Sequence, residues 1–395
     1  MRRFVIIGAG EAGTRAALAL RQAGAGEVVL IGAEPGLPYE RPPLSKPKDV
    51  EVTIRPIATT FDGIDARFGV SVERIDRTAR SVALADGSDV AYDRLLLATG
   101  AQPRTLPFDA EGVALTLRTH HHARAILDRI RPSGHAAILG AGLIGLELAA
   151  GLRLHGMAVT VLEAAPRALG RVLPETIAAE LVARHRQAGV RILFDAKVTA
   201  LKPGRVALDC AEDLSADPVI AAIGVAPDTR LAEAAGLACV NGILVDASLR
   251  TADPDIFAAG DCAAIDHPGY GRFRFETWRN ACDQGAMVAR AMMGEDVAFA
   301  IHPWFWTDQY ELGLQMVGLH DPARMTVRRE LAGGGFILFE LDQQGMLRAA
   351  SGLGPGQAVA RDIRLAEMMI QKGARPAPGM LGDAQMPLKT LLRAA

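Results

Sequence analysis

Two segments of this sequence combine glycines at the spacing that binds the phosphates of a dinucleotide. They read IGAGEAG (7–13) and LGAGLIG (139–145), and each follows a short apolar run. In a G-x-G-x-x-G segment the first glycine permits a tight turn, the second lets backbone approach a pyrophosphate, and the third lets helix pack on strand. The helix N-terminus then offers free N–H groups to the phosphates. The predicted phosphate-binding residues are Gly8, Gly10, Glu11, Ala12, Gly13, Gly140, Gly142, Leu143, Ile144 and Gly145.

An acidic residue follows each glycine segment after a second apolar strand. Glu163 ends the strand 158–162 and stands eighteen residues after the last glycine. A carboxylate there accepts hydrogen bonds from both ribose hydroxyls of NAD and repels the 2′-phosphate of NADP. Arg167 and Arg171 follow closely, which weakens the case against NADP without reversing it. Glu34 is the counterpart in the first segment, although it comes late, twenty-one residues after the last glycine.

Two further strand-like segments end in small residues. DRLLLATGAQPR (93–104) runs into a turn at Thr99 and Gly100, and DIFAAGDCA (255–263) ends on Asp261. An aspartate beside glycine can be plain turn chemistry. Because two nucleotide-binding units are predicted, we expect Asp261 to accept hydrogen bonds from the ribityl or pyrophosphate part of FAD. A chain that holds two dinucleotides is predicted to pass electrons between them.

Glu147 is the one charged residue in the apolar run LGAGLIGLELAAG (139–151). The run contains several glycines and a charge near its middle, which argues against a membrane span. Its flanks leave little polar face on the predicted helix, so a merely solvent-facing carboxylate is the weaker interpretation. A charge buried among apolar neighbours is costly unless it is paired. We therefore expect Glu147 to have a cationic partner.

Composition excludes several classes of protein. The chain has 395 residues and a net charge of −2, without a basic run that would indicate nucleic acid. Its four cysteines form no CxxC pair, which argues against a disulfide framework and a zinc site and favours a reducing, cytoplasmic location. The apolar run within MRRFVIIGAG (1–10) is too short for a signal peptide. The consecutive histidines 120–122 cannot converge on one ion from a helix, so no metal site is predicted.

The chain resembles the two-dinucleotide-binding flavoprotein disulfide reductase superfamily. The nearest likeness is to the ferredoxin reductases of Rieske dioxygenase and cytochrome P450 systems, with the putidaredoxin and rubredoxin reductases close by. The segments that carry it are IGAGEAG (7–13), LPYERPPLSK (37–46), LLLATG (95–100), LGAGLIGLELA (139–149), VLEAAPR (161–167), IFAAGDCA (256–263), PWFWTDQY (303–310) and MPLKTLL (386–392). LPYERPPLSK and PWFWTDQY are more specific than the glycine motifs.

The resemblance implies roles for residues that spacing alone does not identify. Lys46 would sit beside the flavin ring as the partner of Glu147, with Trp306 near the approach of the nicotinamide. The implied catalytic residues are therefore Lys46, Glu147 and Trp306. The implied cofactor-binding residues beyond the glycine segments are Glu34, Arg41, Lys46, Val72, Thr99, Gly100, Arg118, Glu163, Arg171, Gly224, Asp261, Trp278 and Trp306. The family often has an acidic residue where Ala33 stands here, so of the two acidic positions only Glu34 remains.

The resemblance also implies the organisation of the chain. We predict an α/β protein with two Rossmann-like domains, as in glutathione reductase, and a C-terminal α+β domain. The predicted boundaries are 1–107 and 230–300 for a discontinuous FAD domain, 108–229 for the NAD domain, and 301–395 for the C-terminal domain. Strand-like segments at 314–319 and 335–341 and a helix at 358–372 fall in the last of these.

Because the sequence has no redox cysteine pair, no protein thiols are predicted to accept the electrons. The predicted activity is therefore transfer from NADH through FAD to a small iron–sulfur protein, a 2Fe-2S ferredoxin first and rubredoxin second, that feeds an oxygenase. An apoptosis-inducing-factor-like protein, which senses NADH with little turnover, stays open as an alternative. We expect a monomer or homodimer without nucleic-acid or membrane partners. Six arginines are candidates for docking an acidic partner: Arg272, Arg274, Arg279, Arg324, Arg328 and Arg329.

Overall fold

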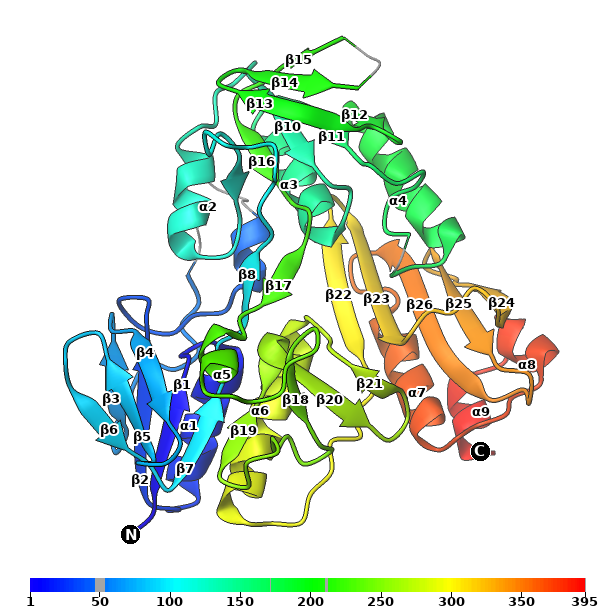
Figure 1. Cartoon of the computed structure of the whole chain (residues 1–395). Helices are drawn as coiled ribbons and strands as arrows, with labels where there is room; N and C mark the ends of the chain where they lie inside the picture. Colours follow the sequence, from blue (N-terminus) through cyan, green and yellow to red (C-terminus); the bar gives the residue numbers. More distant parts are fainter. Residues whose placement is uncertain (47–53, 171, 210–211, 395) are drawn as a thin grey trace. The chain divides into compact units, whose positions relative to one another are not determined.

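A computed structural model describes residues 1–46, 54–170, 172–209 and 212–394. The chain divides into two compact units (Figure 1). The first unit contains residues 1–43, 54–102 and 225–301. The second contains 103–224, 302–395 and a short segment that begins at Leu44. Our finer division at residues 107, 229 and 300 stays a prediction, because the second unit holds both the second glycine segment and the C-terminal residues.

The first unit is built on a five-stranded parallel sheet in the order β19-β7-β1-β2-β3. The strand before the first glycine segment, β1, is its central member, so its carboxyl end opens at the middle of the sheet. Parallel sheets bind ligands at that edge. The strands are β1 (Arg3–Ile7), β2 (Glu27–Gly32), β3 (Asp65–Phe68), β7 (Arg94–Leu97) and β19 (Ile256–Ala258).

Helices and smaller sheets complete the first unit. Helix α1 packs along α6, and apolar residues of both join the core of the parallel sheet. The helices are α1 (Glu11–Gln22), α5 (Arg230–Ala234) and α6 (Trp278–Met293). The remaining strands are β4 (Val72–Asp76), β5 (Ser81–Leu84), β6 (Asp89–Ala91), β17 (Val225–Pro227), β18 (Ile243–Val245), β20 (Ala263–His267) and β21 (Gly271–Phe273).

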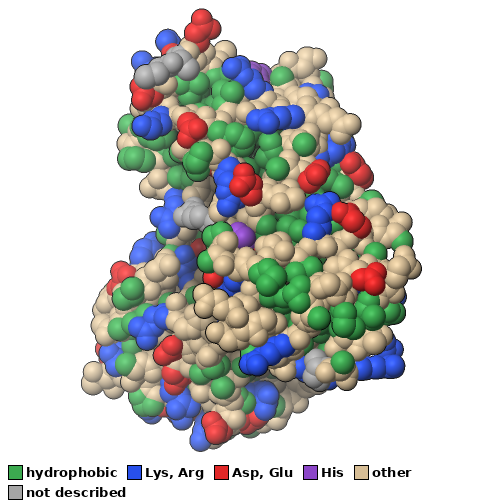
Figure 2. Space-filling view, turned by 90° about the vertical axis from the view of Figure 1, so that its right-hand side faces the viewer, with side chains coloured by type: hydrophobic (Ala, Val, Ile, Leu, Met, Phe, Trp, Pro, Cys, Tyr) green, Lys and Arg blue, Asp and Glu red, His purple; other side chains and the backbone are tan. Residues whose placement is uncertain are grey.

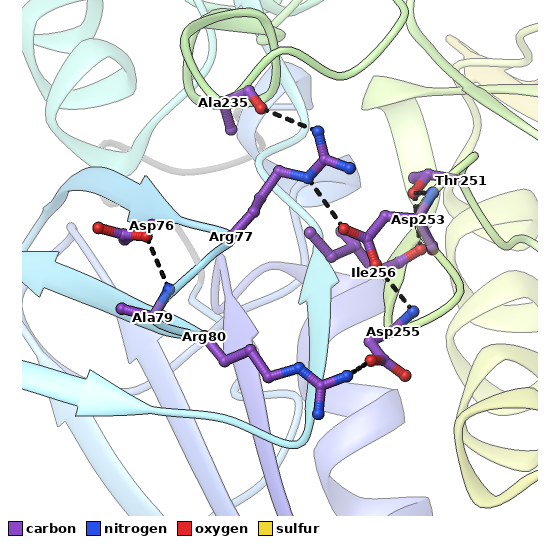
Figure 3. Close-up of polar contacts among 9 residues, drawn as sticks. All are labelled: Asp76, Arg77, Ala79, Arg80, Ala235, Thr251, Asp253, Asp255 and Ile256. Atoms are coloured by element: carbon purple, nitrogen blue, oxygen red, sulfur yellow. Dashed lines mark hydrogen bonds and ion pairs between the residues drawn. The ribbon is translucent and has the colours of Figure 1, made fainter.

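Ion pairs join parts of the first unit that lie far apart in sequence. Figure 3 shows two arginines from the turn after β4 reaching the segment before β19. Arg77 Nε lies 2.9 Å from Asp253 Oδ2, and its Nη1 donates to the carbonyl of Ala235 at 3.3 Å. Arg80 pairs with Asp255. Exposed pairs of this kind are worth about 0–1 kcal/mol each, so the shared apolar core does most to hold the segments together.

The second unit contains another five-stranded parallel sheet, in the order β12-β11-β10-β16-β9. Its central strand β10 precedes the second glycine segment, as β1 precedes the first. The sheet strands are β9 (Leu115–Thr116), β10 (His135–Leu139), β11 (Ala158–Leu162), β12 (Val190–Leu193) and β16 (Val219–Ala221). The other elements here are β13 (Val198–Lys202), β14 (Arg205–Leu208), β15 (Leu214–Ser215), α2 (His120–Leu127), α3 (Leu143–Leu154) and α4 (Glu175–Gln187). Strand β8 (Ala101–Pro103) contains the boundary, with Ala101 and Gln102 in the first unit.

The C-terminal part of the second unit is an antiparallel sheet in the order β22-β23-β26-β25-β24 (Figure 1). Its core forms where buried side chains of β23, β25 and β26 meet those of the last helices. The elements are β22 (Trp304–Gln309), β23 (Leu312–Gly318), β24 (Met325–Glu330), β25 (Phe336–Leu341), β26 (Leu347–Pro355), α7 (Ala360–Gln371), α8 (Pro378–Gly382) and α9 (Leu388–Arg393). Among the described residues, no helix has the length and apolar character to cross a membrane.

The fold class predicted from the sequence is confirmed, with differences at the ends of elements. The strand 158–162 has the expected bounds, and the apolar runs before the two glycine segments form the strands 3–7 and 135–139. Helix α1 begins at Glu11, directly after the glycine turn. Strands β22, β24 and β26 and the helices α8 and α9 were not predicted, since their periodicity is weak beside the apolar runs of β23 and β25.

We expect Gly285→Ala to destabilise the first unit. A Cβ at this position in α6 would lie 2.4 Å from the carbonyl oxygen of Ala12 in α1. Overpacking against a backbone atom costs about 1–3 kcal/mol, which exceeds the gain of about 1 kcal/mol from replacing a helical glycine. The unfolding midpoint measured by circular dichroism should fall by several degrees. Gly379→Ala in α8 is the matched control, because a Cβ there meets nothing within 4 Å; an equal fall in both variants would contradict the prediction.

Candidate functional site

The two glycine segments adopt the same backbone geometry. The first glycine of each, Gly8 and Gly140, has a φ of +107°. A Cβ at Gly8 would lie 2.1 Å from the carbonyl oxygen of Ala98, and one at Gly140 would lie 2.5 Å from that of Ala222. Two effects therefore exclude a side chain at these positions: the left-handed backbone conformation favours glycine, and the neighbouring backbone leaves no room for a Cβ. Both turns bring the chain closely past the end of an adjacent parallel strand.

The second and third glycines differ in what surrounds them. A Cβ at Gly13 or Gly145 would lie about 2 Å from the carbonyl oxygen of the first glycine, so helix and strand can pack only without it. At Gly10 and Gly142 a Cβ would meet no protein atom within 4 Å. These two residues are the N-caps of α1 and α3, and no side chain caps either helix. The open space and the free helix ends fit the phosphates of a dinucleotide in each unit.

Glu163 lies where β11 ends, beside the second glycine turn. Its Oε2 accepts a hydrogen bond from the backbone N–H of Ala141 at 2.7 Å, and its Oε1 accepts one from Ala165 at 2.8 Å. Each carboxylate oxygen has further lone-pair capacity, so hydroxyl donors can still bind. The structure thus holds the carboxylate at the turn, as ribose recognition requires. Arg171, the other predicted contact here, lies outside the described residues.

Glu34 follows β2 and is engaged by two residues of the LPYERPPLSK segment. Its Oε2 accepts from the Tyr39 hydroxyl at 2.5 Å, and its Oε1 lies 2.7 Å from Arg41 Nη2. The bonds place Arg41 and Glu34 together in the first unit, which the sequence did not show. The predicted roles of the two residues toward the ribose and the phosphates of FAD stay predictions.

The side chain of Glu11 holds α1 to α6. Its carboxylate accepts from Trp278 Nε1 at 3.0 Å and from Cys282 Sγ at 3.1 Å, and it pairs with Arg15 at 2.8 Å. Burial, together with the Glu11 charge, raises the pKa of the Cys282 thiol far above its usual range, so it stays protonated. The predicted role of Glu11 at the phosphates of the cofactor stays a prediction.

Other predicted cofactor residues of the first unit lie at strand ends and turns. Thr99 Oγ1 donates to the carbonyl of Asp228 at 2.6 Å, and Gly100 has a φ of +72°. Asp261 lies in a short 3-10 helix directly after β19, at the edge where the first glycine turn also lies. Val72 begins β4. In the second unit, Arg118 lies between β9 and α2, and Gly224 (φ +95°) between β16 and β17.

Glu147 is buried in the second unit beside Lys46, the partner that the family resemblance implied. Only 8% of the residue is exposed, and its Oε1 lies 3.6 Å from Lys46 Nζ. The predicted ion pair is therefore confirmed, while its position at a flavin stays a prediction. Burial raises the pKa of Glu147 above its ordinary value, and the Lys46 charge opposes this without cancelling it. The carboxylate consequently depends on its neighbours to remain ionised.

Three residues around this pair were missed by sequence reasoning. Ser45 Oγ donates to Glu147 Oε2, and Thr307 Oγ1 donates to Oε1 at 2.6 Å. Asp308 Oδ2 lies 3.1 Å from Lys46 Nζ, closer than Glu147 does. All three stand in the LPYERPPLSK and PWFWTDQY segments. The polar residues within those two motifs were the available signal.

Trp306 lies against the same lysine. Lys46 Nζ is 5.3 Å from the centroid of its ring, within the range of a cation–π contact. Trp306 also stacks on Trp304, with ring centroids 5.5 Å apart. The structure therefore brings the three residues with predicted catalytic roles, Lys46, Glu147 and Trp306, into one cluster.

Thr119 and the histidines that follow it form the start of α2. Thr119 caps α2, and its side chain accepts from the backbone N–H of His122. The described part of the chain contains no group of His, Cys, Asp or Glu able to hold a metal ion. The described cysteines Cys239, Cys262 and Cys282 are free thiols.

Comparison with known proteins agrees with this geometry. Residues 2–285 match the pyridine nucleotide-disulphide oxidoreductase family, and residues 304–392 match the reductase C-terminal domain. The chain belongs to the pyridine nucleotide-disulphide oxidoreductase family. Enzymes of this family use FAD and a nicotinamide nucleotide, which accounts for two dinucleotide sites.

Relatives resemble the chain along its whole length. The ferredoxin–NAD(+) reductase component of the anthranilate 1,2-dioxygenase system of Burkholderia cepacia is 41% identical, over 98% of this chain and 99% of its own. Putidaredoxin reductase of Pseudomonas putida is 36% identical, over 99% and 97%. A crystal structure of the covalent putidaredoxin reductase–putidaredoxin complex matches with a TM-score of 0.93 and 33% identity, covering 100% of this chain and 99% of that one.

The expectation that Arg329 contributes to a docking surface is wrong. Only 5% of the residue is exposed. Its guanidinium donates to backbone carbonyls of Leu381, Asp383, Ala384 and Met386, and so holds the C-terminal segment against β24. Arginine suits this position because its rigid fork presents five donors.

Arg274 is also unsuitable as a docking residue. Its side chain is only 6% exposed, and it bonds Asn241, Glu276 and the carbonyl of Asp261. Arg272 and Arg328 are exposed, although each is paired with an acid. On the face drawn in Figure 2, basic and acidic side chains are interspersed rather than gathered by sign.

We expect Glu147→Gln to change how stability depends on pH. A carboxyl group whose pKa is raised in the folded state stabilises the fold below its ordinary pKa of 4.5, and this contribution is lost as the pH rises through the folded value. The Glu147→Gln variant has no carboxyl group at this position, so its stability does not decrease in this way as the pH rises. Its unfolding midpoint, relative to that of the unchanged protein, should therefore increase as the pH is raised above 4.5. Parallel midpoint-against-pH curves for the two proteins would show that Glu147 is not perturbed by burial.

Proposed function

We propose that this protein transfers electrons from NADH through FAD to a small 2Fe-2S ferredoxin that feeds an oxygenase. The observation that carries the proposal is the presence of two uncapped glycine turns in a chain whose sequence has no CxxC pair. Without a redox disulfide, electrons must leave for an external acceptor. A flavin suits this exchange because it accepts a hydride and can release electrons singly. The relatives named as ferredoxin reductases support it over the apoptosis-inducing-factor-like alternative.

The cluster of Lys46, Glu147 and Trp306 would serve the flavin site. The Lys46 ammonium supplies a fixed positive charge, which favours a neighbouring group that becomes more negative as hydride arrives. Glu147 and Asp308 both pair with that ammonium, at 3.6 and 3.1 Å. Trp306 packs against the lysine, which adds an aromatic ring to the cluster. Because these residues come from two separate sequence motifs and α3, their convergence supports a common task.

The nucleotide preference follows from Glu163. Its carboxylate stands at the second glycine turn, where it would accept the ribose hydroxyls of NADH and repel the 2′-phosphate of NADPH. The purified protein should be yellow with non-covalent FAD, and its kcat/KM should be higher for NADH by a factor on the order of ten or more. Glu163→Ala should reduce this ratio mainly through the KM for NADH. Similar kcat/KM values for both nucleotides in the unchanged protein would refute the preference.

The acceptor can be identified by a rate measurement with two iron–sulfur proteins. NADH-dependent reduction should be faster with an acidic 2Fe-2S ferredoxin such as putidaredoxin than with rubredoxin. If charged surfaces dock the ferredoxin, its reduction should fall about fivefold between low and moderate salt, while ferricyanide reduction changes little. Ferricyanide is the control because it reports the NADH half-reaction alone. Turnover with ferricyanide but with neither iron–sulfur protein would contradict the proposed acceptor.

We further propose a cytoplasmic enzyme that works as a monomer or homodimer. The cysteine usage supports a reducing compartment, since three described thiols are free. The ferredoxin would carry its own iron–sulfur cluster, in keeping with the lack of a metal-binding group among the described residues.

A further inference from the structure

A line of hydrogen bonds leads away from Glu147 through the interior of the second unit. Thr307 Oγ1 lies 2.6 Å from Glu147 Oε1, and Gln309 Nε2 lies 3.1 Å from Thr307 Oγ1. Gln309 Oε1 in turn lies 2.8 Å from His185 Nε2. Thr307 and Gln309 stand two residues apart on β22, so their side chains lie on the same face of the strand, while His185 comes from α4. All of them are buried, with His185 at 0% exposure and Thr307 and Gln309 at 1%.

The line ends at the surface, at Tyr310. The Tyr310 hydroxyl lies 3.2 Å from His185 Nδ1, and the two rings pack edge to face. Tyr310 lines a surface cavity of about 480 Å³ together with residues of α3 and α4. Its φ of +56° is unusual for a residue with a bulky side chain. A strained tyrosine at a turn where glycine would fit indicates that the side chain itself is required.

The chemistry of each group sets one direction for the hydrogen bonds. An ionised Glu147 only accepts, so the Thr307 hydroxyl must donate to it. Thr307 can then only accept from the Gln309 amide, whose N–H₂ donates and whose oxygen accepts. Gln309 Oε1 therefore requires His185 to carry its proton on Nε2. The other ring nitrogen, Nδ1, is left as an acceptor for the Tyr310 hydroxyl.

We propose that Tyr310, His185, Gln309 and Thr307 form a positioning relay, a chain of donors pointing one way that holds Glu147 as a carboxylate beside Lys46. The proposal assigns these four residues no direct role on the cofactor, and no proton crosses the Gln309 amide. They act through Glu147, because each donor polarises the next toward the carboxylate. The relay rests on the proposed function, since Glu147 matters for turnover only if the Lys46 cluster serves the flavin.

The protonation states of the outer residues match this direction. Burial lowers the pKa of His185, which favours the neutral ring with one donor and one acceptor nitrogen. Burial also raises the pKa of Tyr310 to about 12, so its hydroxyl keeps the proton that it donates. Arg184, beside His185 in sequence, lies over the Tyr310 ring and is paired with Glu311.

The test is single-turnover reduction of the FAD-loaded full-length protein by NADH, followed anaerobically through the visible absorbance of the flavin. His185→Leu removes the donor to Gln309 and should lower the limiting rate about fivefold, with the Kd for NADH unchanged. His185→Gln, whose side-chain amide can place a donor near the same point, should restore the rate to within about twofold. Tyr310→Phe removes only the outer hydroxyl and should give an intermediate rate.

Two results would overturn the relay. One is a His185→Leu protein, or a Tyr310→Phe protein if the former does not fold, that is reduced at the unchanged limiting rate. The other is an equal fold-loss from His185→Leu in a Glu147→Gln background, because a relay that acts through Glu147 has no further effect once that carboxylate is gone. Failure of the proposed function looks different: the unchanged protein would then not be reduced by NADH at all.

Discussion

The burial of one carboxylate organises the second unit. Glu147 stands on α3 among apolar residues, and an isolated charge there would be neutralised or would destabilise the fold. It is retained because two separate chain segments supply partners: Ser45 and Lys46 in the segment that begins at Leu44, and Thr307 on β22. Removing one partner of a buried pair typically costs about 3–5 kcal/mol. The need to satisfy Glu147 therefore ties the nucleotide-binding sheet, the C-terminal sheet and the segment from Leu44 to one another.

A second constraint is the close approach of backbone to backbone at the two glycine turns. Gly8 and Gly140 pass so near an adjacent strand that no Cβ fits, and Gly10 and Gly142 leave open space in front of an uncapped helix end. The same geometry thus excludes side chains and creates the place for phosphate. The repetition of this turn in both units shows that one physical solution serves two nucleotides. Differences between the sites come from residues outside the turn, chiefly the engaged Glu34 and the turn-facing Glu163.

Much of the fold was readable from the sequence because its signals are local. The strand–glycine–helix order predicted β1, α1, β10 and α3, since turn geometry, phosphate binding and helix packing all demand glycine at fixed spacing. The ends of α1 and the strands β24 and β26 were not predictable to the same degree, because their bounds depend on pairing with neighbours rather than on their own periodicity. The clustering of arginines along the sequence predicted docking roles for Arg329 and Arg274, and both predictions were wrong. Residues that are close in sequence can still be buried, as these two side chains are.

The sequence by itself determined the two-nucleotide architecture, the absence of a redox CxxC pair and the need of Glu147 for a cation. Each of these follows from residue type and short-range spacing. Only the tertiary structure decided that Asp308 lies nearer to Lys46 than Glu147 does, that Glu11 bonds Trp278 and Cys282, and that His185 and Tyr310 connect to Glu147 through β22. Those contacts join residues more than a hundred positions apart. The physical reason is that long-range hydrogen bonds depend on how separate elements pack, and no local pattern encodes that packing.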